Sequence, residues 1–100
     1  MGSEEYASGA WRVREGSERE FIARWGEWLR SSTASVGGFI SARLLQDSSD
    51  PGHFVSFSSW NDAQSRADWK ASPDFATGLA SCRELCDDFQ SADYIEVVSI

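Results

Sequence analysis

The stretch HFVSFSSWND, residues 53–62, carries apolar side chains on both sides of a predicted β-strand. Successive side chains of a strand point to opposite faces, so Phe54 and Trp60 share one face while Val55 and Phe57 share the other. An antiparallel sheet that exposes one face to water alternates apolar with polar residues. This stretch does not alternate in that way, so we expect both faces of its strand to be covered.

Length and charge limit the classes of protein to consider. A chain of 100 residues can bury one hydrophobic core but not two. Its 16 acidic residues outnumber 9 Lys and Arg, and the net charge of -7 argues against nucleic acid or an anionic membrane as partner. No apolar run reaches the roughly 20 residues that span a bilayer, and the start MGSEEYASG lacks the features of a signal peptide. We expect a cytosolic protein with a polar lead-in over residues 1–9 and one domain over residues 10–100.

The first half of the chain predicts a strand, a helix and a second strand. Alternation over residues 10–14 indicates the first strand. Ser17 and Glu20 have the spacing of a capping box, and the helix that follows is expected to run to about Thr33. Helical spacing predicts one buried stripe on it, formed by Phe21, Trp25, Trp28 and Leu29. FISARLLQ, residues 39–46, then reads as a second strand.

The second half predicts a hairpin and two further helices. The sequence DPG at residues 50–52 is typical of a turn and joins the second strand to the strand that ends at Trp60. Asn61 or Asp62 can cap a short helix that runs through Lys70. Ser72-Pro73 then has the form of a helix cap followed by a first-turn proline. One side of this third helix is expected to carry Phe75, Leu79, Cys82, Cys86 and Phe89.

The tail over residues 94–100, YIEVVSI, is rich in β-branched residues and predicts the fourth strand. The resulting order is β-α-β-β-α-β, with the second helical part broken in two. This is the ferredoxin-like α+β plan, a four-stranded antiparallel sheet with helices on one face. Apolar residues occupy both faces of the strands, as Ile40 and Leu44 opposing Phe39 and Leu45 illustrate. We therefore expect a homodimer that packs sheet face against sheet face.

The sequence offers few candidates for a metal site. Cys82 and Cys86 are the only cysteines, and four-residue spacing on a helix indicates a pair of core thiols. The one histidine, His53, follows the predicted turn and is expected at the surface. A metal would require further nitrogen or sulfur ligands nearby, so no metal site is expected.

Several motifs, in this order, resemble the antibiotic biosynthesis monooxygenase family. They are Phe21 with Trp25, Gly37-Gly38-Phe39, Asp50-Pro51-Gly52 before Phe54-Val55-Ser56, Ser59-Trp60, and Asp68-Trp69-Lys70-Ala71-Ser72-Pro73-Asp74-Phe75. The resemblance covers about residues 10–99. It implies a dimeric α+β barrel, in agreement with the two-sided strands.

The resemblance also implies an activity. Some members of the family oxidise phenolic polyketides to quinones without metal, flavin or haem, because an electron-rich phenolate can itself give an electron to O2. Such a protein binds a flat ring, favours its ionised form and excludes water. We expect Trp60 and Ser56 to be the catalytic candidates, with O2 as co-substrate and a small aromatic molecule as substrate. The residues expected to contact the substrate are Trp11, Trp25, Ser58, Arg66, Trp69, Phe75 and Leu79.

The chain departs from two branches of the family at named positions. A quinone-forming member has asparagine and tyrosine where this chain has Ser56 and Arg66, so its residue roles do not transfer directly. The haem-degrading branch has asparagine, tryptophan and an axial histidine where this chain has Gly9, Trp69 and Leu79. Without a nitrogen ligand at the last position, the sequence argues against haem degradation.

Three hypotheses stay open at this level. The first is the cofactor-free monooxygenase, the second a haem-binding or haem-degrading relative, and the third a dimer that binds a small molecule without catalysis. The motifs of serine hydrolases, P-loop proteins, zinc proteases and dinucleotide-binding enzymes are missing from the sequence. The tryptophans can equally form plain core, and the strand serines can bond neighbouring backbone.

Overall fold

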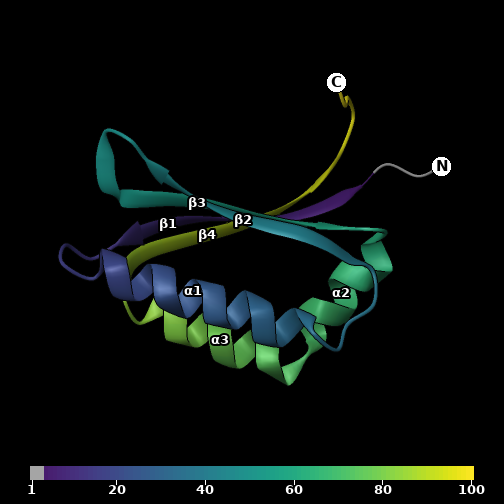
Figure 1. Cartoon of the computed structure of the whole chain (residues 1–100), viewed down its shortest axis with the longest axis horizontal. Coiled ribbons are helices and arrows are strands. Elements are labelled where there is room, and N and C mark those ends of the chain that lie inside the picture. Colours follow the sequence, from purple (N-terminus) through teal and green to yellow (C-terminus); the bar gives the residue numbers. More distant parts are fainter. Residues whose placement is uncertain (1–3) are drawn as a thin grey trace.

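The computed structural model describes residues 4–100 as a four-stranded sheet with three helices on one face (Figure 1). Residues 1–3 of the expected lead-in lie outside the described part. The elements are β1 (Glu5–Val13), α1 (Glu18–Thr33), β2 (Phe39–Asp47), β3 (Asp50–Trp60), α2 (Ala63–Ala71), α3 (Pro73–Arg83) and β4 (Cys86–Ile95).

The sheet has the strand order β2-β3-β1-β4, and every neighbouring pair is antiparallel. This confirms the predicted ferredoxin-like α+β fold. β1 and β3 are the central strands, so the stretch over residues 53–62 lies in the middle of the sheet. Phe54, Ser56, Ser58 and Trp60 face the helices and are buried. The opposite face of the sheet carries no helix (Figure 1).

Helix α1 packs through its predicted stripe, but it begins differently from the prediction. The four residues of the stripe are all buried. The predicted capping box is wrong, because the Ser17 side chain makes no capping bond. Instead the Glu18 carboxylate accepts a hydrogen bond from the Gly16 amide (2.9 Å), and Glu20 pairs with Arg24 one turn later (3.0 Å). The local ion pair therefore takes the carboxylate that a capping box would need.

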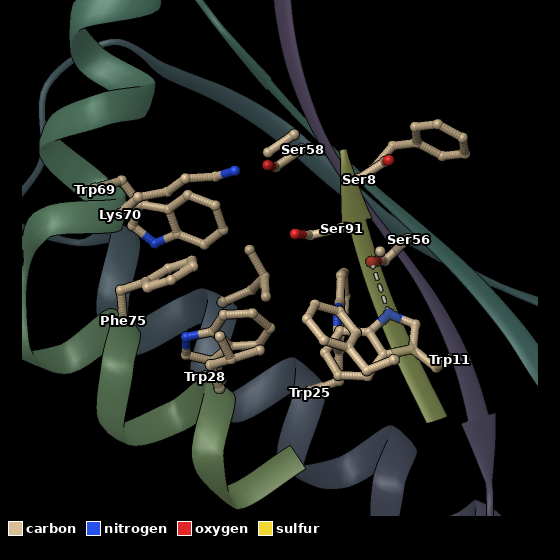
Figure 2. A pocket seen from close by; sticks show the side chains of 16 residues that line it. Ser8, Trp11, Trp25, Trp28, Ser56, Ser58, Trp69, Lys70, Phe75 and Ser91 are labelled. Atoms are coloured by element: carbon tan, nitrogen blue, oxygen red, sulfur yellow. Dashed lines mark hydrogen bonds between the residues drawn. The ribbon is translucent and has the colours of Figure 1, made fainter. Parts of the chain in front are cut away.

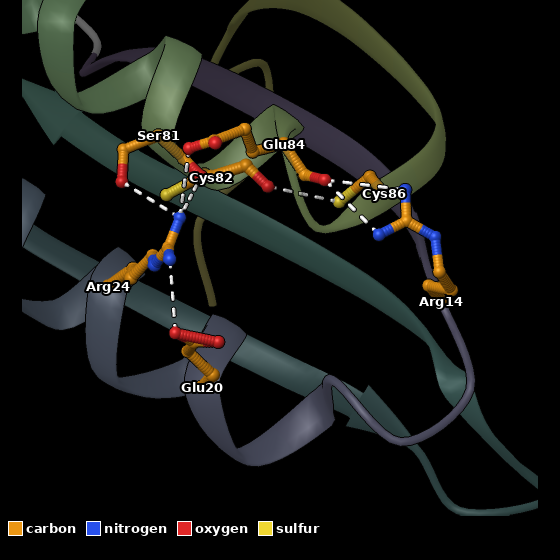
Figure 3. A network of polar contacts seen from close by, with 7 residues as sticks. All are labelled: Arg14, Glu20, Arg24, Ser81, Cys82, Glu84 and Cys86. Carbon is orange, nitrogen blue, oxygen red and sulfur yellow. Dashed lines mark hydrogen bonds and ion pairs between the residues drawn. The ribbon is translucent and has the colours of Figure 1, made fainter.

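Arg24 also ties α1 to the end of α3 (Figure 3). Its guanidinium donates to the Ser81 carbonyl (3.0 Å) and to the Glu84 carboxylate (3.2 Å). Arg14 donates to the Glu84 carbonyl from the opposite side (3.3 Å). These bonds hold the two helices side by side under the sheet, where they form the floor of the cavity described below.

The N-cap predictions for the other helices are confirmed. The Asp62 carboxylate accepts a hydrogen bond from the Ser65 amide (2.8 Å), which lowers its pKa. The Ser72 hydroxyl accepts one from the Phe75 amide (3.2 Å), with Pro73 in the first turn of α3. These caps turn the chain sharply between α2 and α3.

Two strand boundaries differ from the prediction. β1 begins at Glu5 rather than Ala10, so residues 5–9 of the expected lead-in belong to the sheet. β4 spans Cys86–Ile95 rather than residues 94–100, and α3 ends at Arg83. The helical spacing of Cys82, Cys86 and Phe89 was misleading, because β4 contains several acidic and small residues of low strand propensity. Pairing with β1 along its whole length overrides that propensity.

A β-bulge at Ile40 shifts the faces of β2. Phe39 pairs with Trp60 and Ser41 with Ser59, so β2 has one extra residue at this point. Phe39 consequently packs against the Trp60 ring on the helix side, with centroids 5.3 Å apart. The prediction that Phe39 and Leu45 share a face is wrong, because Leu45 pairs with Val55 on the uncovered side.

The two cysteines are free thiols, and the prediction of a core pair on one helix is confirmed for Cys82 but wrong for Cys86. Cys82 is fully buried in α3, and burial raises its pKa to about 12. Cys86 begins β4, is half-buried, and donates from its thiol to the Cys82 carbonyl at 3.4 Å (Figure 3). Burial raises the Cys86 pKa as well. Neither thiol is activated as a nucleophile by its surroundings.

Candidate functional site

A cavity of about 190 Å³ lies between the sheet and the helices (Figure 2). Its position follows from small residues on the helix-facing side of the sheet. Gly9 on β1 has Ser56 and Ser91 as its cross-strand partners, and Ala7 is paired with Ser58 in the neighbouring row. These short side chains leave space beneath the sheet that large residues would fill. The lining comprises Ala7, Ser8, Gly9, Trp11, Trp25, Trp28, Leu29, Ser56, Phe57, Ser58, Trp69, Lys70, Phe75, Leu79, Phe89 and Ser91.

Aromatic rings form the sides and floor of the cavity. Trp28 of α1 stacks on Trp69 of α2 with centroids 5.7 Å apart, and Phe75 of α3 contacts Trp69 edge-on at 4.6 Å. On the other side, Trp11 of β1 packs against Phe89 at 4.2 Å. Offset and edge-to-face contacts of this kind fix ring positions, so the cavity has rigid apolar walls.

Two serine hydroxyls on β3 are oriented by buried indoles. The Trp11 Nε1–H donates to Ser56 Oγ and the Trp60 Nε1–H donates to Ser58 Oγ, both at 3.0 Å. A serine hydroxyl can donate one hydrogen bond and accept two. Because each oxygen here accepts the indole hydrogen, each hydroxyl keeps its own hydrogen for donation. Figure 2 shows Ser56, Ser58 and Ser91 along the sheet side of the cavity, opposite the rings.

Gly9 is required for this arrangement. A Cβ atom at position 9 would lie 2.7 Å from Trp11 Nε1 and 2.9 Å from Ser56 Oγ. Any larger residue, including the asparagine found there in the haem-degrading branch, would displace the Trp11–Ser56 hydrogen bond.

Seven of the nine predicted site residues line the cavity: Trp11, Trp25, Ser56, Ser58, Trp69, Phe75 and Leu79. Trp60 does not. It is fully buried behind the wall, where it contacts Trp69 at 5.1 Å and orients Ser58. Trp60 points toward the helices, as strand parity predicts, and packs against Trp69, which lines the cavity while Trp60 does not.

Arg66 also lies outside the cavity. Its guanidinium forms an ion pair with Glu5 (3.1 Å) and donates to the Tyr6 carbonyl (3.1 Å). The arginine thus joins α2 to the start of β1 and does not line the cavity. The Arg66–Glu5 ion pair was not predictable from the sequence, because Glu5 was expected in the polar lead-in outside the domain.

Nine lining residues were not predicted as site residues, and three of them bear on the chemistry of the cavity: Trp28, Lys70 and Ser91. Trp28 was expected in the buried stripe of α1, but its contact with the cavity depends on how α1 and α3 pack. Ser91 lies in a segment that the sequence pattern does not assign to a strand. Lys70, the only lysine of the chain, was expected only as the last residue of the short second helix.

The Trp28 ring reaches the cavity because α3 carries Gly78 at the contact. A Cβ atom at Gly78 would overlap the Trp28 ring. The Trp28 Nε1–H is buried and has no hydrogen-bond partner within residues 4–100. In Figure 2 this nitrogen lies on the Phe75 side, away from the serines. The cavity therefore has an aromatic floor and a hydroxyl-bearing roof.

Haem does not fit the donors at this site. Leu79, at the position of the axial histidine, lines the cavity with an aliphatic side chain. His53 is at the far end of the β2–β3 hairpin, where it pairs with Asp47 at 3.1 Å. No cluster of three His, Cys, Asp or Glu residues that could hold a metal occurs within the described residues.

The fold and the aromatic cavity define a small α+β domain with an apolar cavity between its sheet and its helices. The profile of the antibiotic biosynthesis monooxygenase family matches residues 6–80. The chain belongs to this family, as the resemblance predicted. Comparison with curated protein sequences gives no significant match.

Solved structures with the same fold cover nearly the whole chain. A variant of SnoaB from Streptomyces nogalater, described as a cofactor-independent oxygenase, aligns with a TM-score of 0.88 over 98% of this chain and 97% of its own, at 18% identity. A conserved protein from Bacteroides thetaiotaomicron aligns with a TM-score of 0.81 over 96% and 100%, at 19% identity. A conserved protein from Methanosarcina mazei aligns with a TM-score of 0.81 over 92% and 91%, at 17% identity. At these identities the likeness establishes the fold.

No helix within residues 4–100 is long and apolar enough to cross a membrane. The expected cytosolic location stays a prediction.

Proposed function

We propose that this protein is a cofactor-independent monooxygenase that oxidises a small phenolic molecule with O2 to a quinone. The observation that carries the proposal is the cavity between sheet and helices, which has aromatic walls, serine hydroxyls aligned on one side and an opening to solvent. Family membership and the fold shared with SnoaB, a cofactor-independent oxygenase, support it.

The reaction needs no external reductant. Ionisation of the phenol gives a phenolate, which transfers one electron to O2 to form a phenoxyl radical and superoxide. The two recombine at the ring carbon para to the oxygen, forming a C–O bond. Loss of that carbon's proton and cleavage of the O–O bond give the quinone and water. For the simplest phenol, one molecule of phenol and one of O2 thus give one molecule of benzoquinone and one of water.

The side chains would act by binding and orientation. Trp28, Trp69 and Phe75 would hold the ring flat and keep water from the radical stage. Ser56 and Ser58 would donate hydrogen bonds to oxygen atoms that gain negative charge, a role in which fixed donors are most effective. Trp60 would act through Ser58, as a positioning residue.

Oxygen uptake under metal chelation tests the proposal. A panel of phenols, 1-naphthols and anthrones, each with hydrogen on the ring carbon to be oxygenated, should include substrates that consume one O2 for each quinone formed. Ser56→Ala should lower turnover about tenfold or more, because it removes a donor. Ser59→Ala is the matched control, since Ser59 is a buried serine of β3 on the opposite face of the sheet. Absence of uptake across the panel would refute the proposal. Turnover in Ser56→Ala and Trp60→Phe that is the same as in the wild type would also refute it. Binding without uptake would instead favour a non-catalytic carrier.

We also propose that the protein is a homodimer through the uncovered sheet face. Leu45 and Tyr94 point outward there and are 50% and 53% exposed. Leu45→Asp should produce monomers in sedimentation velocity. Ile22→Asp, at a 45% exposed position on α1, should leave the dimer intact. A wild-type protein that sediments as a monomer would refute this proposal.

A further inference from the structure

Lys70 is the one charged residue in the cavity lining that the structure describes. It lies in the last turn of α2, and its side chain is 29% exposed. Figure 2 shows the chain of Lys70 extending past the Trp69 ring, with its ammonium group directed toward the side of Ser58 and Ser91. Ser91 is exposed on the edge strand β4. Lys70 and Ser91 therefore mark the side on which the cavity meets solvent.

Ion pairs hold the ammonium group at this rim. Lys70 Nζ lies 2.6 Å from Asp93 Oδ1, and Arg66 Nε lies 3.7 Å from the same oxygen. Arg66 is in turn fixed by Glu5. Of these four charged residues, Lys70 contacts the cavity. The cluster is neutral overall, because two carboxylates balance two cations, and an anion in the cavity would share the Lys70 ammonium with Asp93.

We propose that Lys70 binds the phenolate oxygen of the substrate and lowers the pKa of the bound phenol. This inference rests on the proposed function and assigns a substrate class to the same site. The ring would lie among Trp28, Trp69 and Phe75, with its ionised oxygen directed to Lys70 and the Ser58 hydroxyl. The phenol proton passes to a solvent base at the exposed rim, and Lys70 stays protonated throughout. An opposite charge within about 4–6 Å lowers a pKa by about 1–3.

The volume limits the size of the substrate. A cavity of about 150 Å³ lined by aliphatic and aromatic side chains accommodates benzene. The cavity of this protein, about 190 Å³, therefore suits a phenol of one or two rings better than an extended polycycle. Its substrate class is a one- or two-ring hydroxylated aromatic that binds as the anion.

Titration of a bound chromophoric phenol tests the role of Lys70 without turnover. The probe is 4-nitrophenol, whose ionised form absorbs visible light, measured anaerobically with the whole protein. In the wild type its pKa should fall by about 1 or more on binding. Lys70→Gln should return it to within about half a unit of the free value, whereas Lys70→Arg should keep most of the decrease. Failure of the probe to bind, or an equal bound pKa in wild type and Lys70→Gln, would overturn the proposal.

Two further measurements separate the parts of the inference. Because Lys70 is the only lysine, isotopic labelling of lysine at Cε gives one side-chain resonance. This resonance should shift with 4-nitrophenol and stay in place with its methyl ether, which cannot ionise; equal shifts would overturn the contact. 2-Naphthol should bind more tightly than anthrone, and the reverse order would overturn the size assignment. None of these experiments depends on O2 uptake, so the role of Lys70 and the oxygenase activity can fail separately.

Discussion

The hydrogen bond from Trp11 to Ser56 makes a quantitative prediction, because it is the contact that orients a proposed catalytic hydroxyl. Both residues are buried, with exposed fractions of 2% and 7%, and the two atoms are 3.0 Å apart. Ser56→Ala leaves the indole N–H without its acceptor in a buried site. Leaving such a donor unpaired costs about 1–3 kcal/mol. We expect the free energy of unfolding to fall by this amount.

A double-mutant cycle isolates the contribution of the bond. Trp11→Phe removes the donor and also costs packing energy, which is common to both arms of the cycle. In the Trp11→Phe background, Ser56→Ala should cost less by about 1 kcal/mol or more, because no N–H is left unpaired. Urea denaturation followed by circular dichroism measures all four proteins. Equal costs of Ser56→Ala in both backgrounds would refute the reasoning.

Three other predictions concern packing, pH and thiol reactivity. Gly78→Ala should lower the free energy of unfolding by about 1 kcal/mol or more, since overpacking against Trp28 outweighs the higher helix propensity of alanine. Gly26→Ala is the control and should not destabilise, because its Cβ would meet only the movable end of Arg30; thermal melts compare the two, and equal effects would contradict the packing argument. The Asp62 pKa is lowered in the folded state, so its stabilising effect is present above the unfolded value of about 3.9 and lost as pH falls through the folded value. Asp62→Asn should flatten this acid-limb dependence in denaturation curves, and an unchanged slope would count against the cap. Iodoacetamide at pH 8 should label half-buried Cys86 before Cys82, whose pKa is about 12. Mass spectrometry measures the order of labelling, and labelling of Cys82 first would contradict the prediction.

The fold was predictable where local patterns and tertiary packing agree. The stripe on α1 and the two later helix caps depend on periodicity and on neighbouring residues, and these predictions are confirmed. The predicted position of β4 was wrong because its sequence has low strand propensity and the strand is held in place by pairing with β1. The faces of β2 were predicted wrongly for a related reason. The bulge at Ile40 adds one residue to β2, and an extra residue shows only when the strand is aligned with its partner β3.

The candidate site was predictable as a collection of aromatic and serine residues, but its geometry was not. Strand parity correctly placed Ser56 and Ser58 under the helices. Parity could not reveal that Trp60 packs against Trp69 without lining the cavity. It also could not place Lys70, whose position at the rim depends on the ion pair with Asp93, a residue of the misassigned strand.

The tryptophans around the cavity give the protein a built-in optical reporter. Trp11 and Trp28 have ring centroids 6.2 Å apart, and Trp28 and Trp69 are 5.7 Å apart, so excitation can pass among them. A quinone that formed between these rings would accept that excitation and quench the emission of the whole group. Emission would then recover as the coloured molecule departs, and a stopped-flow trace would time its release.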